Sequence, residues 1–530
     1  MTSGPQLAPP SARLARLIFL AATIALGLAG LAVRGYTALA TPDILEWDET
    51  YYASTTATAA ADLGYFPFVQ GYPVIPHMGG IGRVVDAYVL AYKAFGPSLL
   101  PLRAVSLAAS ALAVLGIALL TSRLGGRPAG LVAFAVTPSL LVFNGINSIR
   151  LDAMAVAFVA WALLVFVRLR PRPTALPQAI VGGLLSVGLN VHLHTAAAAF
   201  GVGCVYLADC VNQGPRSAAH PLRRLGAFVA GYAIGATIFL AVTVLPAPGS
   251  YFRSAALARL SAVDSDTSLT LTAPMDPAKL AASFLSPAEI LPKEFTRYSS
   301  MVRGMPWWER ILWLVGVPLF LLRGQMSALY PARVLLPGAM VGAGIVLNSS
   351  APVYFAPLLP FFVPALAVLV TGTSARSRPR LVVRPATTVA VVALAVAMTL
   401  TLTHRLRVSR DTARTAAVES LPAPAAEVLT RVSTECTLAG PTGLYARYFM
   451  AYPRFVGTRR AEVLIGATYA GHSDDLVAYW RTKQPDVVFG PLAPELGQYV
   501  SEQKYEPVVR DVWRRPQVSA GCRIRSASPD

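Results

Sequence analysis

Long apolar segments recur between residues 1 and 404, and short polar stretches separate them. A membrane-spanning helix needs about 20 mainly apolar residues to cross the hydrocarbon core. The first such segment runs from Leu14 to Val33. Further segments lie at roughly 101–121, 128–144, 151–167, 179–193, 195–211, 225–245, 309–323, 334–348, 352–371 and 386–404. The pattern predicts an all-α polytopic membrane protein with about eleven transmembrane helices, although the region 179–211 could be miscounted by one.

Composition supports a membrane protein. The hydrophobic fraction is 55% and the charged fraction only 14%, whereas soluble domains average roughly 25% charged residues. A soluble core cannot cover that much apolar surface, so we expect lipid to cover it. The net charge of +18 would suggest a nucleic-acid partner in a soluble protein. The positions of the basic residues favour another explanation.

Arginines gather in alternate short loops, as the positive-inside rule requires of cytoplasmic loops. With the N-terminus in the cytoplasm, the inside loops hold Arg123 and Arg127; Arg168, Arg170 and Arg172; Arg216, Arg223 and Arg224; Arg323 and Arg333; and Arg376, Arg378, Arg380 and Arg384. Topology therefore accounts for much of the basic charge, and we expect no nucleic-acid partner. The same orientation predicts a multi-pass plasma-membrane protein with two long outside loops, at about 35–98 and 246–308, and an extracytoplasmic tail.

The tail, residues 405–530, is predicted to be a small α/β domain after the membrane domain of residues 1–404. Segments 415–433, 475–483 and 495–502 have helical patterns, and 461–465 and 486–489 have strand patterns. The tail shows no catalytic constellation, so we expect it to support the membrane domain or to recognise the acceptor. Its two cysteines, Cys436 and Cys522, lie in the predicted oxidising compartment and are expected to form a disulfide.

The first outside loop carries the most informative chemistry. It has no Lys or Arg between Gly35 and Gly82. Its acidic residues are Asp43, Glu46, Asp48, Glu49 and Asp62. Adjacent carboxylates such as Asp48 and Glu49 can hold a divalent cation, share a proton or act as a general base. The alternative is a solvated acidic loop whose aromatic residues lie at the membrane interface.

Several short motifs lie at or near the predicted outer side of the membrane. Their order along the chain and their side of the membrane are specific when taken together. They are Trp47-Asp48-Glu49-Thr50-Tyr51-Tyr52-Ala53; Tyr72-Pro73-Val74-Ile75-Pro76-His77; Phe95-Gly96-Pro97-Ser98 running on to Leu102-Arg103; Ser148-Ile149-Arg150-Leu151-Asp152; and Tyr354-Phe355-Ala356-Pro357-Leu358-Leu359-Pro360. Over most of residues 1–404 the chain thus resembles the GT-C glycosyltransferases. Within them it is most similar to the protein O-mannosyltransferases and the lipid A aminoarabinose transferases, the family 39 and 83 group.

The resemblance implies a sugar donor linked to polyprenyl phosphate, with the lipid phosphate as leaving group. It implies that Asp48 is the catalytic base, and that Glu49 supports it, binds the acceptor or helps to place a metal. Arg150 matches an arginine of that family and would bind the donor phosphate; the alternative is an arginine that snorkels to the interface. Asp152 is expected to serve only as a helix N-terminal residue, because a helix does not bring residues two apart together.

Two histidines, His192 and His194, interrupt an apolar run near the outside end of a predicted span. The related transferases often have a lysine here that contacts the lipid phosphate, so both are candidates for donor-phosphate binding, which a protonated imidazole does best. A His-x-His pair can instead supply two metal ligands, provided that the helix breaks there. A hydrogen-bonded helix-end histidine is the third alternative.

Three further residues, His77, Tyr52 and Tyr354, are candidates for contacts with the acceptor or a metal. The cofactor is unknown, with a divalent cation as one option. The chain has no P-loop or dinucleotide fingerprint, which agrees with a lipid-linked donor. The motif Trp307-Trp308-Glu309 resembles the Trp-Trp-Asp of oligosaccharyltransferases, but its place at the entrance to a span favours an aromatic belt.

The sequence therefore predicts an integral-membrane glycosyltransferase, hexosyl or pentosyl, that moves a sugar from a polyprenyl-phosphate donor to a lipid, glycan or protein acceptor on the outer face. The alternative is a transporter or lipid flippase. Transporters usually show internal repeats and broken helices in both halves, and no convincing repeat is visible here. The sequence does not identify the sugar.

Overall fold

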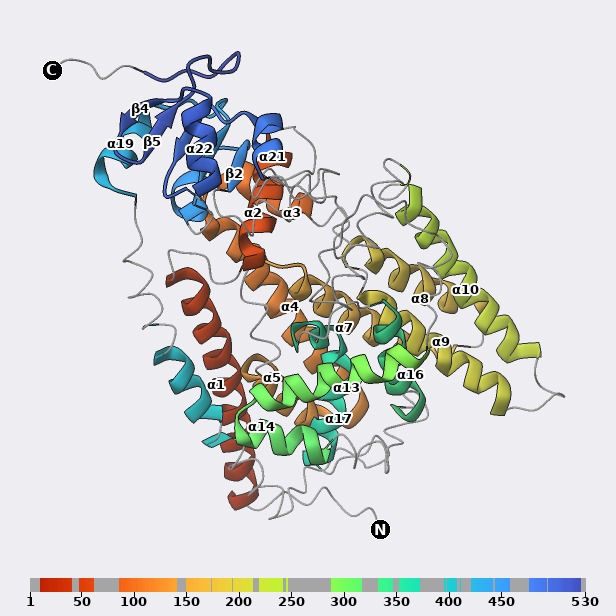
Figure 1. Cartoon of the computed structure of the whole chain (residues 1–530). Coiled ribbons are helices and arrows are strands. Elements are labelled where there is room, and N and C mark those ends of the chain that lie inside the picture. Colours follow the sequence, from red (N-terminus) through yellow and green to blue (C-terminus); the bar gives the residue numbers. More distant parts are fainter. Residues whose placement is uncertain are drawn as a thin grey trace, which may run out of the picture.

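The protein consists of a helical body with a small mixed sheet at one end (Figure 1). A computed structural model describes residues 10–40, 47–61, 85–140, 149–172, 174–192, 194–212, 219–241, 245, 287–316, 332–346, 352–371, 395–396, 398–407, 410, 421–441, 444–457, 476–492 and 494–525. The helices of the body are α1 (Pro10–Ala40), α2 (Trp47–Ala60), α3 (Val85–Phe95), α4 (Leu99–Gly125), α5 (Arg127–Val136), α7 (Asp152–Leu169), α8 (Ala175–Val187), α9 (Thr195–Asn212), α10 (Ala219–Phe239), α13 (Pro287–Gly304), α14 (Trp307–Ile311), α16 (Ala332–Val346) and α17 (Leu359–Thr371).

Four helical segments of the described chain are long and apolar enough to cross a membrane. They are Leu17–Leu39, Leu99–Gly125, Asp152–Leu169 and Thr195–Asn212, and two shorter apolar helices lie at Ala175–Asn190 and Phe355–Val368. Large apolar side chains are exposed along α1, among them Leu17 at 61% and Leu28 at 56%, which suits a surface covered by lipid. The chain is a membrane protein, but the described residues do not establish the predicted total of about eleven spans.

Small residues let the helices of the body approach closely. A Cβ added at Gly182 of α8 would lie 2.1 Å from the carbonyl oxygen of Phe228 on α10, and one at Gly231 of α10 would lie 2.0 Å from that of Ala179. A Cβ at Gly201 of α9 would similarly meet Leu335 of α16 at 2.7 Å. Glycine at such interfaces is typical of helix packing in membranes, where van der Waals contact replaces the hydrophobic effect.

The tail contains a five-stranded sheet in the order β2-β1-β3-β5-β4. The strands are β1 (Leu438–Gly440), β2 (Phe455–Gly457), β3 (Val487–Phe489), β4 (Glu506–Val509) and β5 (Val512–Arg514). Strand β1 pairs in parallel with β2 and β3, and β5 pairs antiparallel with β3 and β4. Helices α19 (Ala423–Arg431), α21 (Leu476–Lys483) and α22 (Pro494–Glu502) accompany the sheet.

These elements overlap the three helices predicted for the tail, and β3 falls on the predicted strand 486–489. The other predicted strand, 461–465, lies outside the described residues. The predicted disulfide is confirmed: Cys436 and Cys522 are bonded, with their Cα atoms 4.4 Å apart. The bond ties the segment before β1 to the end of the chain, where Val432 also forms a β-bridge with Ile524.

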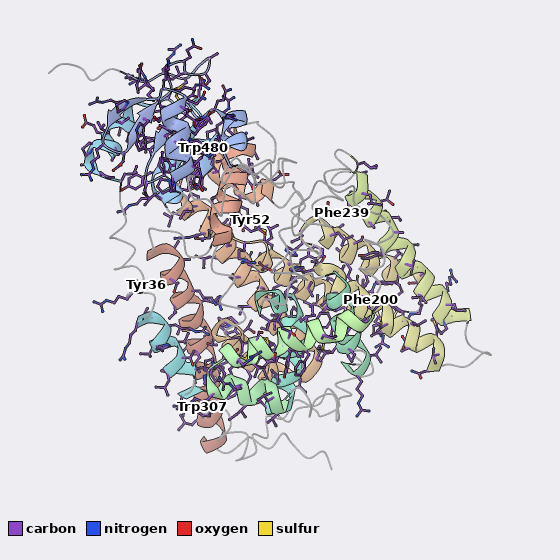
Figure 2. The ribbon with its side chains drawn as sticks, in the orientation of Figure 1. Tyr36, Tyr52, Phe200, Phe239, Trp307 and Trp480 are labelled. Carbon is purple, nitrogen blue, oxygen red and sulfur yellow. A yellow bond between two sulfur atoms is a disulfide. The ribbon has the colours of Figure 1, made fainter. Side chains whose placement is uncertain are left out.

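The tail and the helices of the first long loop share one hydrophobic core. Tyr52 of α2 and Tyr88 of α3 are buried in the same cluster as Phe449 and Met450 of the tail. The hydroxyl of Tyr92 on α3 donates to the carbonyl oxygen of Met450 at 2.8 Å. In Figure 2, Tyr52 lies between the tail, marked by Trp480, and the helical body. The tail is therefore packed onto α2 and α3.

Candidate active site

A buried ion pair joins the first turn of α2 to the start of α4. The side chains of Glu49 and Arg103 are 0% and 2% exposed. Arg103 donates from Nε to Glu49 Oε1 at 3.0 Å and from Nη2 to Oε2 at 2.7 Å. The backbone N–H of Ile149, just before α7, also donates to Oε1, at 3.0 Å. Charge-assisted hydrogen bonds at one carboxylate thus hold three parts of the chain together.

This geometry favours one of the three roles predicted for Glu49. Both carboxylate oxygens accept hydrogen bonds from protein groups, which agrees with a residue that supports the start of α2; contact with an acceptor or metal stays a prediction. Asp48, the predicted base, occupies the same first turn of α2. Its side chain lies outside the described residues, and its role stays a prediction.

The sequence analysis was wrong about Arg150 and Asp152, which form a buried ion pair. Arg150 Nε donates to Asp152 Oδ2 at 2.7 Å, and the two side chains are 4% and 1% exposed. The helical spacing argument does not apply because α7 begins only at Asp152, so Arg150 belongs to the irregular segment before it. The hydroxyl of Tyr88 holds this segment by donating to the carbonyl oxygen of Arg150 at 3.0 Å.

The helix break that joint metal ligation by the two histidines would require is present. Helix α8 ends at Val187, a 3₁₀ turn follows at Gly188–Asn190, and α9 begins at Thr195. His192 and His194 lie in the connection, 3% and 6% exposed, with ring centroids 3.6 Å apart. His194 Nδ1 lies 3.9 Å from Asp152 Oδ1. The break therefore brings the His-x-His pair against the carboxylate at the start of α7, which a continuous helix would not do.

His192 differs from the cation that phosphate binding would need. Burial lowers the pKa of His192 to about 4; the charge of Asp152 opposes this effect and that of Arg150 adds to it. His192 is therefore neutral near pH 7, which counts against its predicted role in binding the donor phosphate. Its Nδ1 accepts a hydrogen bond from the backbone N–H of His194 at 3.2 Å.

Among the three remaining candidates, Tyr52 has a described side chain. It is 6% exposed and packs in the core shared with the tail, and its contact with an acceptor or metal stays a prediction. His77 lies outside the described residues. Tyr354 belongs to the 3₁₀ segment Pro352–Leu358, but its side chain also lies outside them.

Arg103 and the pair Trp307–Trp308, to which the sequence assigned no part in the site, have defined surroundings in the structure. In the sequence Arg103 was only part of a motif, yet it neutralises Glu49. An arginine inside the start of a span that follows an acidic loop could have indicated this ion pair. Trp307 is 70% exposed, while Trp308 is buried and donates from Nε1 to Thr401 Oγ1 at 2.8 Å. Trp307 thus lies at the surface and Trp308 packs inside the body. Neither is part of the cluster of Glu49, Arg103, Arg150, Asp152 and the two histidines.

A helical membrane body whose first-loop helices pack beneath a small C-terminal sheet is the architecture of the GT-C fold, the fold of membrane glycosyltransferases. One solved structure that matches over almost the whole chain is ArnT from Cupriavidus metallidurans bound to undecaprenyl phosphate. The TM-score is 0.54 at 15% identity, covering 94% of this chain and 98% of that one. The same protein in its apo state gives 0.51 at 15% identity, with 93% and 97% covered.

The predicted resemblance to the GT-C glycosyltransferases is therefore confirmed at the level of the fold. A weaker likeness, with a TM-score of 0.44 at 14% identity, links 88% of this chain to 68% of the oligosaccharyltransferase of Archaeoglobus fulgidus. No protein-family model matches the sequence, and no curated protein sequence matches it.

Proposed function

We propose that this protein is an integral-membrane glycosyltransferase that moves a hexose or pentose from a polyprenyl-phosphate donor to a lipid, glycan or protein acceptor on the outer face of the membrane. The observation that carries the proposal is the match over nearly the full length of both chains to ArnT, a structure holding undecaprenyl phosphate. The cluster of buried charged groups supports it, because those groups gather at the N-terminal ends of α4 and α7, beneath the tail.

In the proposed reaction Asp48 removes the proton from an acceptor hydroxyl. The acceptor oxygen then attacks the anomeric carbon of the sugar, and the bond from that carbon to the lipid phosphate breaks. The phosphate leaves with the bonding electrons. In this proposal Arg150 donates to the phosphate oxygens with its planar guanidinium, and Glu49 holds the start of α2 in position.

The proposal also fixes an orientation. We place the N-terminus in the cytoplasm, about eleven spans across the plasma membrane, and the tail outside, as the positions of the arginines predict. The bond between Cys436 and Cys522 supports an outside tail, because disulfides persist in oxidising compartments. Residues 1–404 are the proposed catalytic domain, and residues 405–530 the proposed supporting domain.

Deletion of the gene followed by mass spectrometry of envelope glycolipids and glycoproteins tests the proposed function. Loss of one sugar from one acceptor is expected and would name both. If no glycan loses a sugar, while the purified protein in liposomes moves a lipid or solute across the bilayer, the transporter alternative is correct.

Asp48→Asn tests the base. Turnover should fall by roughly 100- to 10,000-fold while binding of polyprenyl phosphate is unchanged, because a general base contributes about that much to rate. Asp511→Asn is the matched control. Asp511 lies in the tail at a φ of 62°, which asparagine tolerates as readily as aspartate. Near-normal turnover in Asp48→Asn would exclude this role.

A further inference from the structure

Three buried side chains converge where the break before α9 meets the start of α7. Asp152, His192 and His194 each place one potential ligand atom within 4.8 Å of the other two. They come from two separate parts of the chain, so the grouping is a product of the fold. The imidazole rings lie 3.6 Å apart between centroids, so both occupy the same small volume.

The two carboxylate oxygens of Asp152 have different surroundings. Oδ2 accepts from Arg150 Nε, whereas Oδ1 is buried and has no hydrogen-bond partner among the described residues. Oδ1 faces His194, whose Nδ1 lies 3.9 Å away. A buried carboxylate oxygen without a partner is costly, and a cation beside it would satisfy it.

We propose that Asp152, His192 and His194 bind a divalent transition metal, zinc by their ligand set, which leaves a fourth coordination position open. Two imidazoles and one carboxylate suit zinc, whereas calcium and magnesium prefer oxygen ligands. Tetrahedral zinc with bonds of about 2.0–2.2 Å sets its ligand atoms roughly 3.4 Å apart, so His194 Nδ1 and Asp152 Oδ1, now 3.9 Å apart, need to close by about half an ångström. The metal replaces the long hydrogen bond between His194 N and His192 Nδ1.

The surroundings fit a bound metal. A ligating carboxylate is usually held by a hydrogen bond to its other oxygen, and Arg150 supplies that bond to Asp152. Both imidazoles are buried, at 3% and 6% exposure, so the site is shielded from water except at the open position.

The open position gives the metal its role, a step that rests on the proposed function. With Arg150, a dication and one carboxylate, the cluster carries a net charge of +2. Such a centre binds a phosphate oxygen of the lipid donor and stabilises the charge that develops on the leaving phosphate.

Metal content of the purified full-length protein tests the site without any transfer assay. After dialysis, the wild type and the control variant His220→Asn, at an exposed position on α10, should hold about one zinc per chain. Asp152→Asn and His194→Asn should lower occupancy by more than about tenfold. Equal zinc in the wild type and the two variants would overturn the site.

A second variant distinguishes loss of the metal from loss of the fold. His194→Lys places an ammonium beside Asp152, so it should keep the elution volume and the disulfide of the wild type but hold no zinc. Zinc retained by this variant would also overturn the site. Cobalt added to the metal-stripped wild type should give the intense visible bands of a four-coordinate site, and undecaprenyl phosphate should shift them.

The same measurements separate the two proposals. An unshifted cobalt spectrum overturns the phosphate role. Bound zinc in a protein that transfers no sugar overturns the proposed function and leaves the metal site intact. Sugar transfer by a protein free of metal overturns the catalytic role of the metal.

Discussion

Replacing Glu49 and Arg103 by methionine, singly and together, tests whether their ion pair holds α2 in place. Both side chains are almost completely buried and share a bidentate contact. Removal of one partner leaves the other charge buried and uncompensated, which costs about 3–5 kcal/mol of unfolding free energy. Each single substitution should therefore lower stability by that amount.

The double substitution should cost far less than the sum. It leaves the backbone N–H of Ile149 and the carbonyl oxygen of Ala38 without the hydrogen bonds that Glu49 and Arg103 now make with them. Each such group costs about 1–3 kcal/mol when buried. Two apolar side chains of similar volume otherwise replace a buried ion pair at little cost. The two single substitutions sum to about 6–10 kcal/mol and the double costs about 2–6 kcal/mol. The coupling between the two sites should then be about 4 kcal/mol, above the roughly 0.5–3 kcal/mol usual for residues in contact.

The assay is unfolding of the purified protein in detergent, followed by fluorescence, with sugar transfer measured on the same samples. Arg514→Met provides a control, because Arg514 pairs with Glu506 at the exposed surface of the tail. Surface pairs contribute about 0–1 kcal/mol, so this variant should be nearly as stable as the wild type. If the effects of the two single substitutions simply add, the pair does not couple α2 to α4 and the reasoning fails.

Three further predictions follow from the fold and the site. Arg150→Lys should weaken the binding of polyprenyl phosphate by roughly tenfold or more, because a charged hydrogen bond contributes about 1.5–3 kcal/mol and the planar fork is lost; unchanged affinity would remove Arg150 from the phosphate site. Gly231→Ala should destabilise the α8–α10 pair by about 1–3 kcal/mol through overpacking, while Gly226→Ala on the same helix, where a Cβ meets nothing within 4 Å, should not; equal melting temperatures would contradict this. Cys436→Ser should lower the unfolding free energy of the tail by about 4 kcal/mol, since the bond closes a loop with a sequence separation of 86; reductant should destabilise the wild type but not the variant.

The sequence predicted the parts of this protein that depend on local pattern. Apolar length marked α1, α4, α7 and α9, because a span must satisfy its backbone internally and face lipid. The strand at β3 and the helices of the tail also followed from periodicity. The pairing of Cys436 with Cys522 needed only their position, since no other cysteine lies in the tail.

The contacts of the candidate site could not be predicted in the same way. Whether Arg150 can reach Asp152 depends on where α7 begins, and helix boundaries are the least certain feature of a sequence. The pairing of Glu49 with Arg103 spans 54 residues and depends on how α2 folds back onto α4. The resemblance alone distinguished Asp48 from Glu49 in the sequence, and the bond of Glu49 to Arg103 is a contact that adjacent carboxylates do not reveal.

The core shared by the tail with α2 and α3 has a consequence for the order in which the protein is made. Tyr92 and Met450, which are hydrogen-bonded, lie 358 residues apart. The helix that carries Asp48 and Glu49 is synthesised early, but the residues that cover it arrive after the last span has left the ribosome. A nascent chain, or one cut short by a late stop codon, can therefore insert every helix of the body and still leave that helix without its packing partner. Full-length synthesis then becomes a condition for a competent site.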